Sequence, residues 1–212
     1  MPELPEVETI RRQLEPLLLG ARLVDAWAFP SGKFTPAIEA VGTRVRSVGR
    51  RGKYLLIGLD RDGGAEELVI HLGMTGRLSV ATSADRVDGA AGPGGADGDA
   101  GSSWARSVRT PATDGDADAL GAAPTTSHLR ARWTLDDGRW LLFDDVRRFG
   151  RIAVVVAGEH GDLPTLAALG PEPFDDDFSP EHLREQVNRS ARALKTQLLS
   201  QRVVAGVGNI YA

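Results

Sequence analysis

Apolar residues near the start of the chain recur at steps of three and four, at Val7, Ile10, Leu14, Leu17 and Leu18. This spacing places them on one face of a helix. Pro5 suits the first turn, because an amide hydrogen there would have no partner within the helix, and Gly20 is typical of a residue that ends a helix. We therefore expect the chain to open with an amphipathic helix.

The apolar period then changes to two, which is typical of strands that bury one face. The segments with this pattern are 22–28, 43–49, 53–60, 67–72, 76–80, 128–135, 139–144 and 151–157. A hairpin turn is predicted between two of them, at Asp136, Asp137 and Gly138. Short strands with tight turns favour an antiparallel β-sandwich of about eight strands. The long segment after the fifth strand would then be an enlarged hairpin loop.

The pattern becomes helical from Leu163 onward. Ser179 and Pro180 predict an N-cap followed by a proline at the first helical position. A further helix is indicated by Leu194, Leu198 and Leu199. The fold class that follows is α+β, with a helix and a sandwich followed by helices.

A glycine-rich turn at 204–209 comes just before the chain stops at Ala212. Because another helix is expected after such a turn, we interpret the sequence as a fragment. The predicted organisation is a sandwich domain over residues 1–158 and the first part of a helical domain over 159–212.

Residues 81–127 differ from the rest because they are rich in Ala, Gly, Ser and Thr and have no sustained apolar period. Such a segment cannot bury enough surface to offset its ordering entropy, so we predict a disordered insertion. It carries seven Asp and three Arg, and without it the chain has 22 acidic and 22 basic residues. The net charge of −4 therefore does not argue against a nucleic-acid partner. Trp104, with Arg106 and Arg109 nearby, is the one feature of the insertion that could contact a partner.

Composition excludes several classes of protein. The sequence has no run of 18 apolar residues, so no membrane-spanning helix and no membrane partner are expected. Its start is acidic and proline-rich, unlike a secretory signal, and a cytoplasmic location is expected. The absence of cysteine excludes disulfides, thiolate nucleophiles and cysteine-ligated metals within these residues.

The first residues suggest covalent chemistry. If Met1 is removed, Pro2 becomes a secondary amine that can attack an electrophilic sugar carbon and form an iminium. An α-amino group has a pKa of about 7.7–8.0, and the positive end of a following helix disfavours its protonated form. Glu3 would be an adjacent acid and Glu6 a positioning carboxylate. The alternative is that both glutamates simply favour the start of a helix.

Five segments, taken in order, resemble the bacterial formamidopyrimidine-DNA glycosylases, which excise oxidised purines. They resemble the family's N-terminus, lysine-bearing strand, methionine loop, intercalation loop and helix–two-turn–helix turn. In this sequence they are 2–9, 50–56, 71–76, 144–150 and 204–212. The resemblance covers essentially the whole chain except residues 81–127.

The resemblance implies roles for individual residues. Pro2 is similar to the family's nucleophile, Glu3 to the acid that assists sugar-ring opening, and Lys53 to the lysine that contacts phosphate and donates a proton during β-elimination. Turning a nucleotide out of the duplex costs about a few kcal/mol of stacking, which inserted side chains partly recover. The side chains that match this role are Met74, Arg147 and Phe149. Without the motifs, Lys53 would be a surface charge, Met74 a core residue and Phe149 a strand-edge aromatic.

Other candidates for DNA contact are spread along the chain. His128 and Lys195 match phosphate-contact positions of the family, whereas Arg148 is either a third contact or only a surface neighbour. Asn209 lies in the glycine-rich turn, where free amides can hold a phosphate. His71 is interpreted as a hydrogen-bonded structural histidine.

The activity implied by the resemblance is bifunctional. It combines a glycosylase for 8-oxoguanine and formamidopyrimidines, acting through a Schiff base on Pro2, with an abasic-site lyase. The implied partner is damaged double-stranded DNA. The protein is expected to be a monomer in the bacterial cytoplasm. The family continues into a four-cysteine zinc finger with an arginine that assists the second elimination, and these residues contain neither. We therefore expect no cofactor in this chain and weak or no activity from the chain alone.

Three alternatives remain at this point. An endonuclease VIII-type glycosylase for oxidised pyrimidines shares the architecture, but Leu4 and Pro5 favour the purine branch. A non-catalytic damage-binding paralogue would be indicated by loss of Pro2 or Glu3, and both are present. A carbohydrate-binding sandwich would need exposed aromatic platforms, yet only 6% of the residues are aromatic.

Overall fold

The computed structural model describes residues 2–82, 125–176 and 178–212. The helices are α1 (Leu4–Leu18), the 3-10 helix η1 (Thr35–Ala40), α2 (Pro164–Ala167), α3 (Pro180–Asn188) and α4 (Leu194–Leu199). The strands are β1 (Leu23–Ala28), β2 (Arg44–Arg51), β3 (Tyr54–Arg61), β4 (Gly64–His71), β5 (Gly76–Ala81), β6 (Leu129–Leu135), β7 (Trp140–Asp145) and β8 (Arg151–Val156). The predicted α+β class, with an N-terminal helix and eight strands in the described residues, is confirmed.

The strands form two four-stranded antiparallel sheets, in the orders β1-β6-β7-β5 and β2-β3-β4-β8. Their inner faces enclose one core, to which Ile57 and Trp133 contribute from opposite sheets. The indole Nε1 of Trp133 donates to the carbonyl of Ala37 over 2.8 Å, which satisfies its buried N–H. Helix α1 adds Val7 and Leu14 to the same core, as its apolar face predicts.

Two details of the strand prediction were wrong. Strand β4 begins at Gly64, earlier than expected, because residues 64–66 show no apolar alternation, although Glu66 pairs with Leu59 of β3. Strand β5 pairs with β7 and not with β6, so the segment between β5 and β6 is a crossover and not a hairpin loop. Alternation identifies a strand but carries no information about its partner. The predicted disorder of 81–127 falls mostly on residues 83–124, which lie outside the described residues, as does Trp104.

The short turns and caps follow the sequence closely. The β6–β7 hairpin closes through Gly138, whose amide donates to the carbonyl of Leu135 over 3.0 Å. Ser179 caps α3, with its hydroxyl accepting from the amide of His182 over 3.1 Å. Among the described residues, every helix is too short or too polar to span a membrane. The domain bounds 1–158 and 159–212 stay a prediction.

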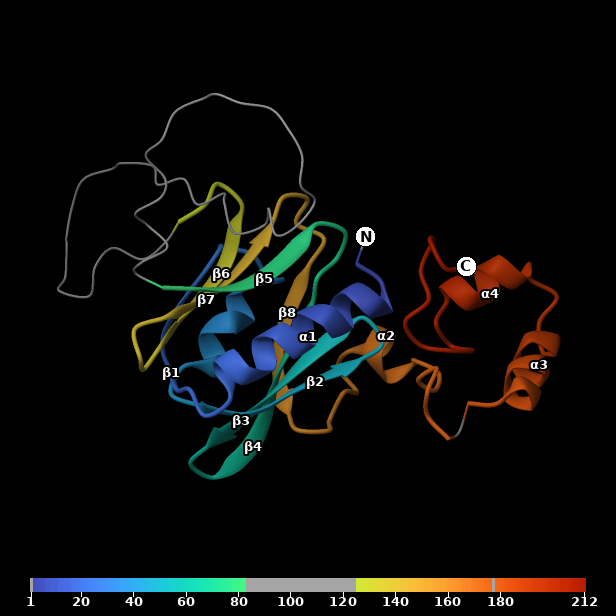
Figure 1. Ribbon diagram of the computed structural model, residues 1–212, viewed down its shortest axis with the longest axis horizontal. Coiled ribbons are helices and arrows are strands. Elements are labelled where there is room, and N and C mark those ends of the chain that lie inside the picture. The colour runs from blue at the N-terminus through green and yellow to red at the C-terminus, as the bar shows by residue number, and fades with distance from the viewer. Residues whose placement is uncertain (1, 83–124, 177) are drawn as a thin grey trace.

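The C-terminal segment returns to the start of the chain. Figure 1 shows α3 and α4 at one end of the molecule, with the start of α1 on the side of the sandwich that faces them. The amide of Leu4 donates to the carbonyl of Gly206 over 3.3 Å. Gly206 has φ +87°, and a Cβ there would lie 2.3 Å from the Leu4 side chain. Only glycine allows this approach, so residues 2–6 pack directly against the C-terminal turn.

Candidate active site

The centre of the site is the carboxylate of Glu3, which is fully buried. One oxygen, Oε2, accepts from the amide of Gly208 over 2.8 Å, and the other, Oε1, accepts from the amide of Ile210 over 2.7 Å. A third amide, that of Tyr211, lies 3.4 Å from Oε2. Burying a carboxylate is costly unless its oxygens are hydrogen-bonded, and these amides supply the bonds. The C-terminal turn is therefore an anion-binding turn whose anion is Glu3.

This finding corrects the interpretation of the glycine-rich turn. Its free amides were expected to hold a phosphate, but three of them bind Glu3 because a carboxylate is also an anion that suits such a turn. Asn209 itself is exposed at the same turn, and its side chain stays a predicted phosphate contact. Lys195 is also exposed, with Nζ 3.4 Å from the carbonyl oxygen of Ala212.

Glu6 has a structural position next to Glu3. Its Oε2 accepts from the backbone amide of Glu3 over 2.9 Å, which satisfies a free amide at the start of α1. The two glutamates thus support the start of the helix, and Glu3 additionally occupies the site. Pro2 precedes Glu3 directly and is half-buried. Removal of Met1 lies outside the described residues and stays a prediction.

Lys53 lies beside the Glu3 carboxylate. It occupies the turn between β2 and β3, not the strand as expected, and only 5% of it is exposed. A Cβ built on Gly208 would lie 2.5 Å from Glu3 Oε1 and 2.6 Å from Lys53 Nζ, so the two charged groups flank the same glycine. Burial lowers the pKa of Lys53, while the charges of Glu3 and Glu6 raise it. A surface-charge role for Lys53 is therefore wrong.

His71 lies close enough to Lys53 for the charge of the lysine to act on its ring. Its Nδ1 accepts from the amide of Gly73 over 3.2 Å, and its ring centroid lies 4.7 Å from that of Tyr54. Burial lowers the pKa of His71, and the positive charge of Lys53 lowers it further. The ring is therefore held neutral, and its interpretation as a hydrogen-bonded structural histidine is confirmed.

The three side chains expected to fill the DNA duplex lie on neighbouring loops. Met74 is 38% exposed and Phe149 49% exposed, so neither belongs to the core. The guanidinium of Arg147 lies 4.8 Å from the centre of the Phe149 ring. Gly73 has φ +65°, and a Cβ there would lie 2.6 Å from the amide nitrogen of Gly150. The methionine loop and the loop after β7 are therefore in direct contact.

The remaining predicted residues are at the periphery of these loops. His128 is exposed just before β6, and its carbonyl accepts from the amide of Asp145 over 2.9 Å. The guanidinium of Arg148 lies 5.6 Å from the Phe29 ring, while its carbonyl accepts from Lys33 Nζ over 3.1 Å. Arg148 thus packs on the sandwich, which fits the interpretation as a surface neighbour.

The sequence patterns predict no role for Asp145, although it lies in the segment 144–150 that resembles the intercalation loop. This carboxylate is fully buried and accepts from side-chain and backbone donors on both loops. An aspartate that directly precedes a turn is a known signal, because its side chain readily accepts from nearby backbone amides. Gly208 was identified only as a turn residue, although its missing Cβ is what admits Glu3 and Lys53.

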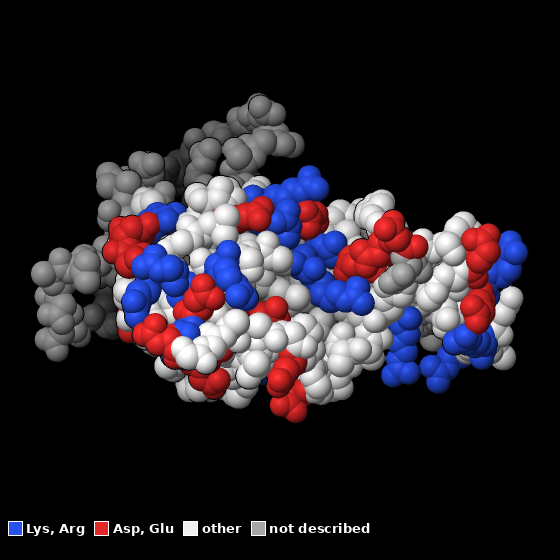
Figure 2. Space-filling model, turned by 90° about the horizontal axis from the view of Figure 1, so that it is seen from below, with Lys and Arg blue, Asp and Glu red and all other residues white. Residues whose placement is uncertain are grey.

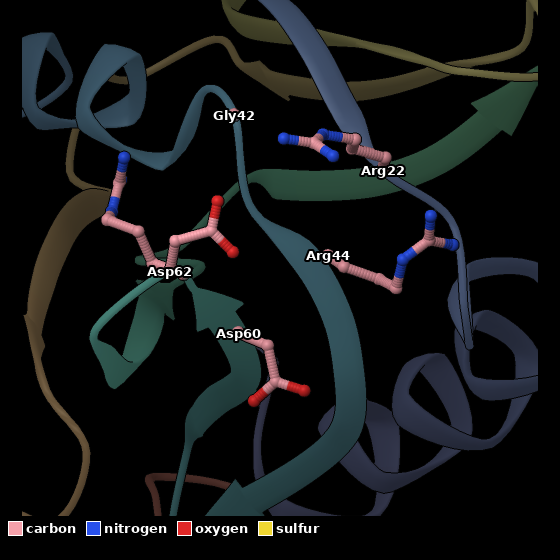
Figure 3. A pocket seen from close by; sticks show the side chains of 6 residues that line it. Arg22, Gly42, Arg44, Asp60 and Asp62 are labelled. Carbon is pink, nitrogen blue, oxygen red and sulfur yellow. The ribbon is translucent and has the colours of Figure 1, made fainter.

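A separate pocket lies at the opposite end of β3 from Lys53. Its lining comprises Arg22, Gly42, Arg44, Asp60, Arg61 and Asp62 (Figure 3). Arg61 is already paired with Glu66 at 3.0 Å, and the lining mixes both signs of charge. The pocket contains none of the predicted site residues, so it does not contribute to the Glu3–Lys53 site.

Comparison with known proteins places this geometry in a family. Residues 1–152 match the family model of the formamidopyrimidine-DNA glycosylase N-terminal domain, and residues 169–212 match that of the formamidopyrimidine-DNA glycosylase H2TH domain. The first match alone spans more than half of the chain. The chain belongs to the formamidopyrimidine-DNA glycosylase family.

Curated members of the glycosylase family are similar along the whole chain. The formamidopyrimidine-DNA glycosylase of Deinococcus radiodurans is 37% identical over 220 residues, and that of Thermus thermophilus is 38% identical over 212 residues. Each alignment covers 100% of this chain but 62% of the relative. The chain thus spans less than two thirds of the length of these relatives.

Solved structures of the glycosylase family share the fold. The crystal structure of the Thermus thermophilus protein has a TM-score of 0.73 and 38% identity, covering 99% of this chain and 61% of that chain. The Lactococcus lactis glycosylase non-covalently bound to DNA with an abasic site has a TM-score of 0.71 and 28% identity, covering 99% of this chain and 66% of that one. The resemblance drawn from the five motifs is therefore confirmed.

The zinc ion implied by the resemblance does not fit the residues present. The described residues contain no group of three or more His, Cys, Asp or Glu side chains that could hold a metal ion. The sequence also lacks cysteine, the ligand type of the expected finger. Zinc therefore remains a family-level expectation.

Proposed function

We propose that this protein is a base-excision repair enzyme that removes oxidised purines, 8-oxoguanine and formamidopyrimidines, from duplex DNA and then cleaves the abasic site by β-elimination. The observation that carries the proposal is that the buried side chains of Glu3 and Lys53 approach the same glycine, Gly208, and that Pro2 directly precedes Glu3. Both relatives named formamidopyrimidine-DNA glycosylase and a family structure bound to DNA support it.

The chemistry begins with the amine of Pro2. Its lone pair attacks C1′ of the damaged nucleotide, and the bond from C1′ to the base breaks with its electrons leaving on the base. The Glu3 carboxylate takes the remaining N–H proton of Pro2 and passes it to the ring oxygen as the C1′–oxygen bond opens, which leaves a cationic iminium between Pro2 and C1′. The hydrogen bonds from Gly208 and Ile210 hold the carboxylate that results.

Strand cleavage follows from the iminium. The cation acidifies the C2′ protons, so that loss of one proton expels the phosphate on C3′ and breaks the strand by β-elimination. Lys53 is proposed to contact the phosphate and to donate a proton during this step. Its lowered pKa favours proton transfer, because a buried ammonium releases its proton more readily than an exposed one.

DNA association is proposed to depend on local contacts and not on a uniformly basic surface. Figure 2 shows acidic and basic side chains interspersed over the face it presents. The proposed phosphate contacts are Lys53, His128, Arg147, Lys195 and Asn209, which would set the register of the duplex. The exposed side chains of Met74 and Phe149 would then enter the space left by the extruded nucleotide.

Borohydride trapping tests this function. The full-length gene product is mixed with a duplex carrying 8-oxoguanine opposite dC, or with the matched abasic duplex, and reduced during the reaction. We expect a covalent protein–DNA adduct that peptide mapping places on Pro2, and an intact mass that lacks Met1. Glu3→Gln should lose base excision more than abasic-site cleavage, whereas Glu39→Gln, an exposed control, should match the unmodified protein. Absence of any adduct on abasic DNA, or activity of protein that retains Met1, would contradict the proposal.

A further inference from the structure

The buried carboxylate of Asp145 joins the two loops that carry the exposed side chains of Met74, Arg147 and Phe149. Its Oδ1 accepts from the hydroxyl of Thr75 over 2.5 Å and lies 3.2 Å from the amide of Arg147. Its Oδ2 accepts from the amide of Gly150 over 2.7 Å. Asp145 is 0% exposed, so these donors and not water satisfy its charge.

Among the described residues that donate to the Asp145 carboxylate, Thr75 is the only one on the methionine loop. Its hydroxyl also accepts from the amide of Arg147 over 3.1 Å. Thr75 therefore contacts both the carboxylate and the backbone of the facing loop. Because Met74 and Thr75 are consecutive, this contact fixes the position of Met74 relative to Arg147.

The loop after β7 is supported from its other side as well. The buried guanidinium of Arg130 donates from Nε to the carbonyl of Asp145 over 2.8 Å. Arg130 also lies 5.1 Å from the centre of the Phe29 ring, and Lys33 donates to the carbonyl of Arg148 over 3.1 Å. The backbone that presents Arg147 and Phe149 is thus held at several points, and Asp145 supplies the side-chain hydrogen bond that links Thr75 of the methionine loop to it.

We propose that Asp145 is a positioning residue that couples the two loops, so that Met74, Arg147 and Phe149 enter the duplex as one preassembled wedge. The inference rests on the proposed function. A wedge held in place before binding avoids the cost of ordering two loops at the moment when a base is unstacked. Asp145 touches neither the sugar nor the base, and it acts through Thr75 and the loop amides.

The sharpest test uses Thr75, because its side chain can lose the hydroxyl without losing its shape. Thr75→Val removes both hydroxyl contacts, whereas Thr75→Ser keeps them. Thr35→Val is the matched control, since the Thr35 hydroxyl donates to the carbonyl of Ser31 at an exposed site. Asp145→Asn tests the same contact from the carboxylate side. Its NH2 group would replace one carboxylate oxygen and place a donor opposite a group that also donates.

Two rates are compared under single-turnover conditions: excision of 8-oxoguanine opposite dC, and cleavage of a preformed abasic site in the same duplex. We expect Thr75→Val and Asp145→Asn to slow excision by roughly tenfold or more. Cleavage of the abasic duplex should change much less, because no base has to be unstacked there. Thr75→Ser should restore excision, and Thr35→Val should leave both rates unchanged.

Hydrogen exchange provides a readout that needs no DNA. In Thr75→Val the amides of Arg147 and Gly150 should exchange faster than in the unmodified protein, while the core strand β3 should not change. Unchanged exchange at these amides, or an equal loss of excision and abasic cleavage, would overturn the coupling role of Asp145. If the unmodified protein processes neither duplex, the proposed function fails, and the exchange experiment still decides whether Asp145 couples the loops.

Discussion

Glu3 and Gly208 meet across 205 positions of sequence, with the Gly208 amide donating to Glu3 Oε2 over 2.8 Å. The contact requires that residue 208 have no side chain. A Cβ there would lie 2.4 Å from Glu3 Cδ and 2.6 Å from Lys53 Nζ. Gly208 therefore connects the chain start, the β2–β3 turn and the C-terminal segment at a single point.

Gly208→Ala should disable the site with little change elsewhere. The new methyl group must displace either the Glu3 carboxylate or the Lys53 ammonium, and a shift of about 1 Å can cost about a hundredfold in rate. We expect a loss of this order in borohydride trapping on abasic DNA. Gly161→Ala is the matched control, because a Cβ there has no neighbour within 4 Å. Normal trapping by Gly208→Ala would mean that the turn is not part of the reacting site.

Local sequence patterns predicted the elements but not their long-range contacts. Apolar alternation and the Asp-Asp-Gly turn located the β6–β7 hairpin, because both signals depend on residues close in sequence. The pairing of β5 with β7 and the contact of Glu3 with Gly208 were not predictable in this way. Their partners are distant in sequence, and the turn amides that bind Glu3 have no side-chain signature.

Lys53 should give abasic-site cleavage an alkaline limit below the usual range for lysine. Burial lowers its pKa, so the protonated form persists below that pKa and is lost as the pH rises through it. If Lys53 donates a proton, the cleavage rate must fall in the same window. Lys53→Arg should move this fall to higher pH, because arginine stays protonated.

The check is single-turnover cleavage measured from about pH 6 to about pH 10, with DNA binding measured separately at each pH. Arg46→Lys is the control, because it places a lysine at an exposed position whose described ion pair is with Asp60, outside the site. An alkaline limb that is identical in the unmodified protein and Lys53→Arg would assign it to another group.

Glu8 should contribute acid-sensitive stability. Hydrogen bonds from Arg11, and then from Arg12 and Arg50, lower the pKa of Glu8 from 4.5 to about 2 despite partial burial. A carboxylate with a lowered pKa stabilises the folded state above its unfolded pKa, and this contribution is lost as the pH falls from about 4.5 toward about 2. Glu8→Gln should therefore lower the free energy of unfolding at pH 7 by about 1 kcal/mol, a modest value because solvent screens the group.

Thermal unfolding of both proteins across this pH range measures the effect. The difference in Tm between the unmodified protein and Glu8→Gln should shrink as the pH falls below about 4.5 and be largely lost at about pH 2. Glu181→Gln, an exposed change in the first turn of α3, should show a much smaller difference. If the Tm difference between the unmodified protein and Glu8→Gln does not depend on pH, Glu8 acts through packing and not through its charge.

Glu172 should control how firmly the β2–β3 turn is fixed. Its Oε2 lies 2.7 Å from Arg50 Nη1, and its Oε1 accepts from the amide of Gly52 over 2.6 Å. Gly52 directly precedes Lys53, so the carboxylate holds the backbone that delivers the ammonium to Glu3. Glu172→Gln removes the charge and leaves Arg50, whose side chain is 13% exposed, without one of its two acidic partners.

Loss of one partner from a largely buried pair costs about 1–3 kcal/mol, so we expect Glu172→Gln to lower Tm measurably. It should also slow abasic-site cleavage, because Lys53 is no longer held in place. A double-mutant cycle separates the two effects: adding Glu172→Gln to Lys53→Ala should cost stability but little further activity. Glu185→Gln, which breaks an exposed pair with Arg189, should change neither quantity appreciably. Additive losses of activity in the double variant would show that Glu172 acts on the site by a route that does not involve Lys53.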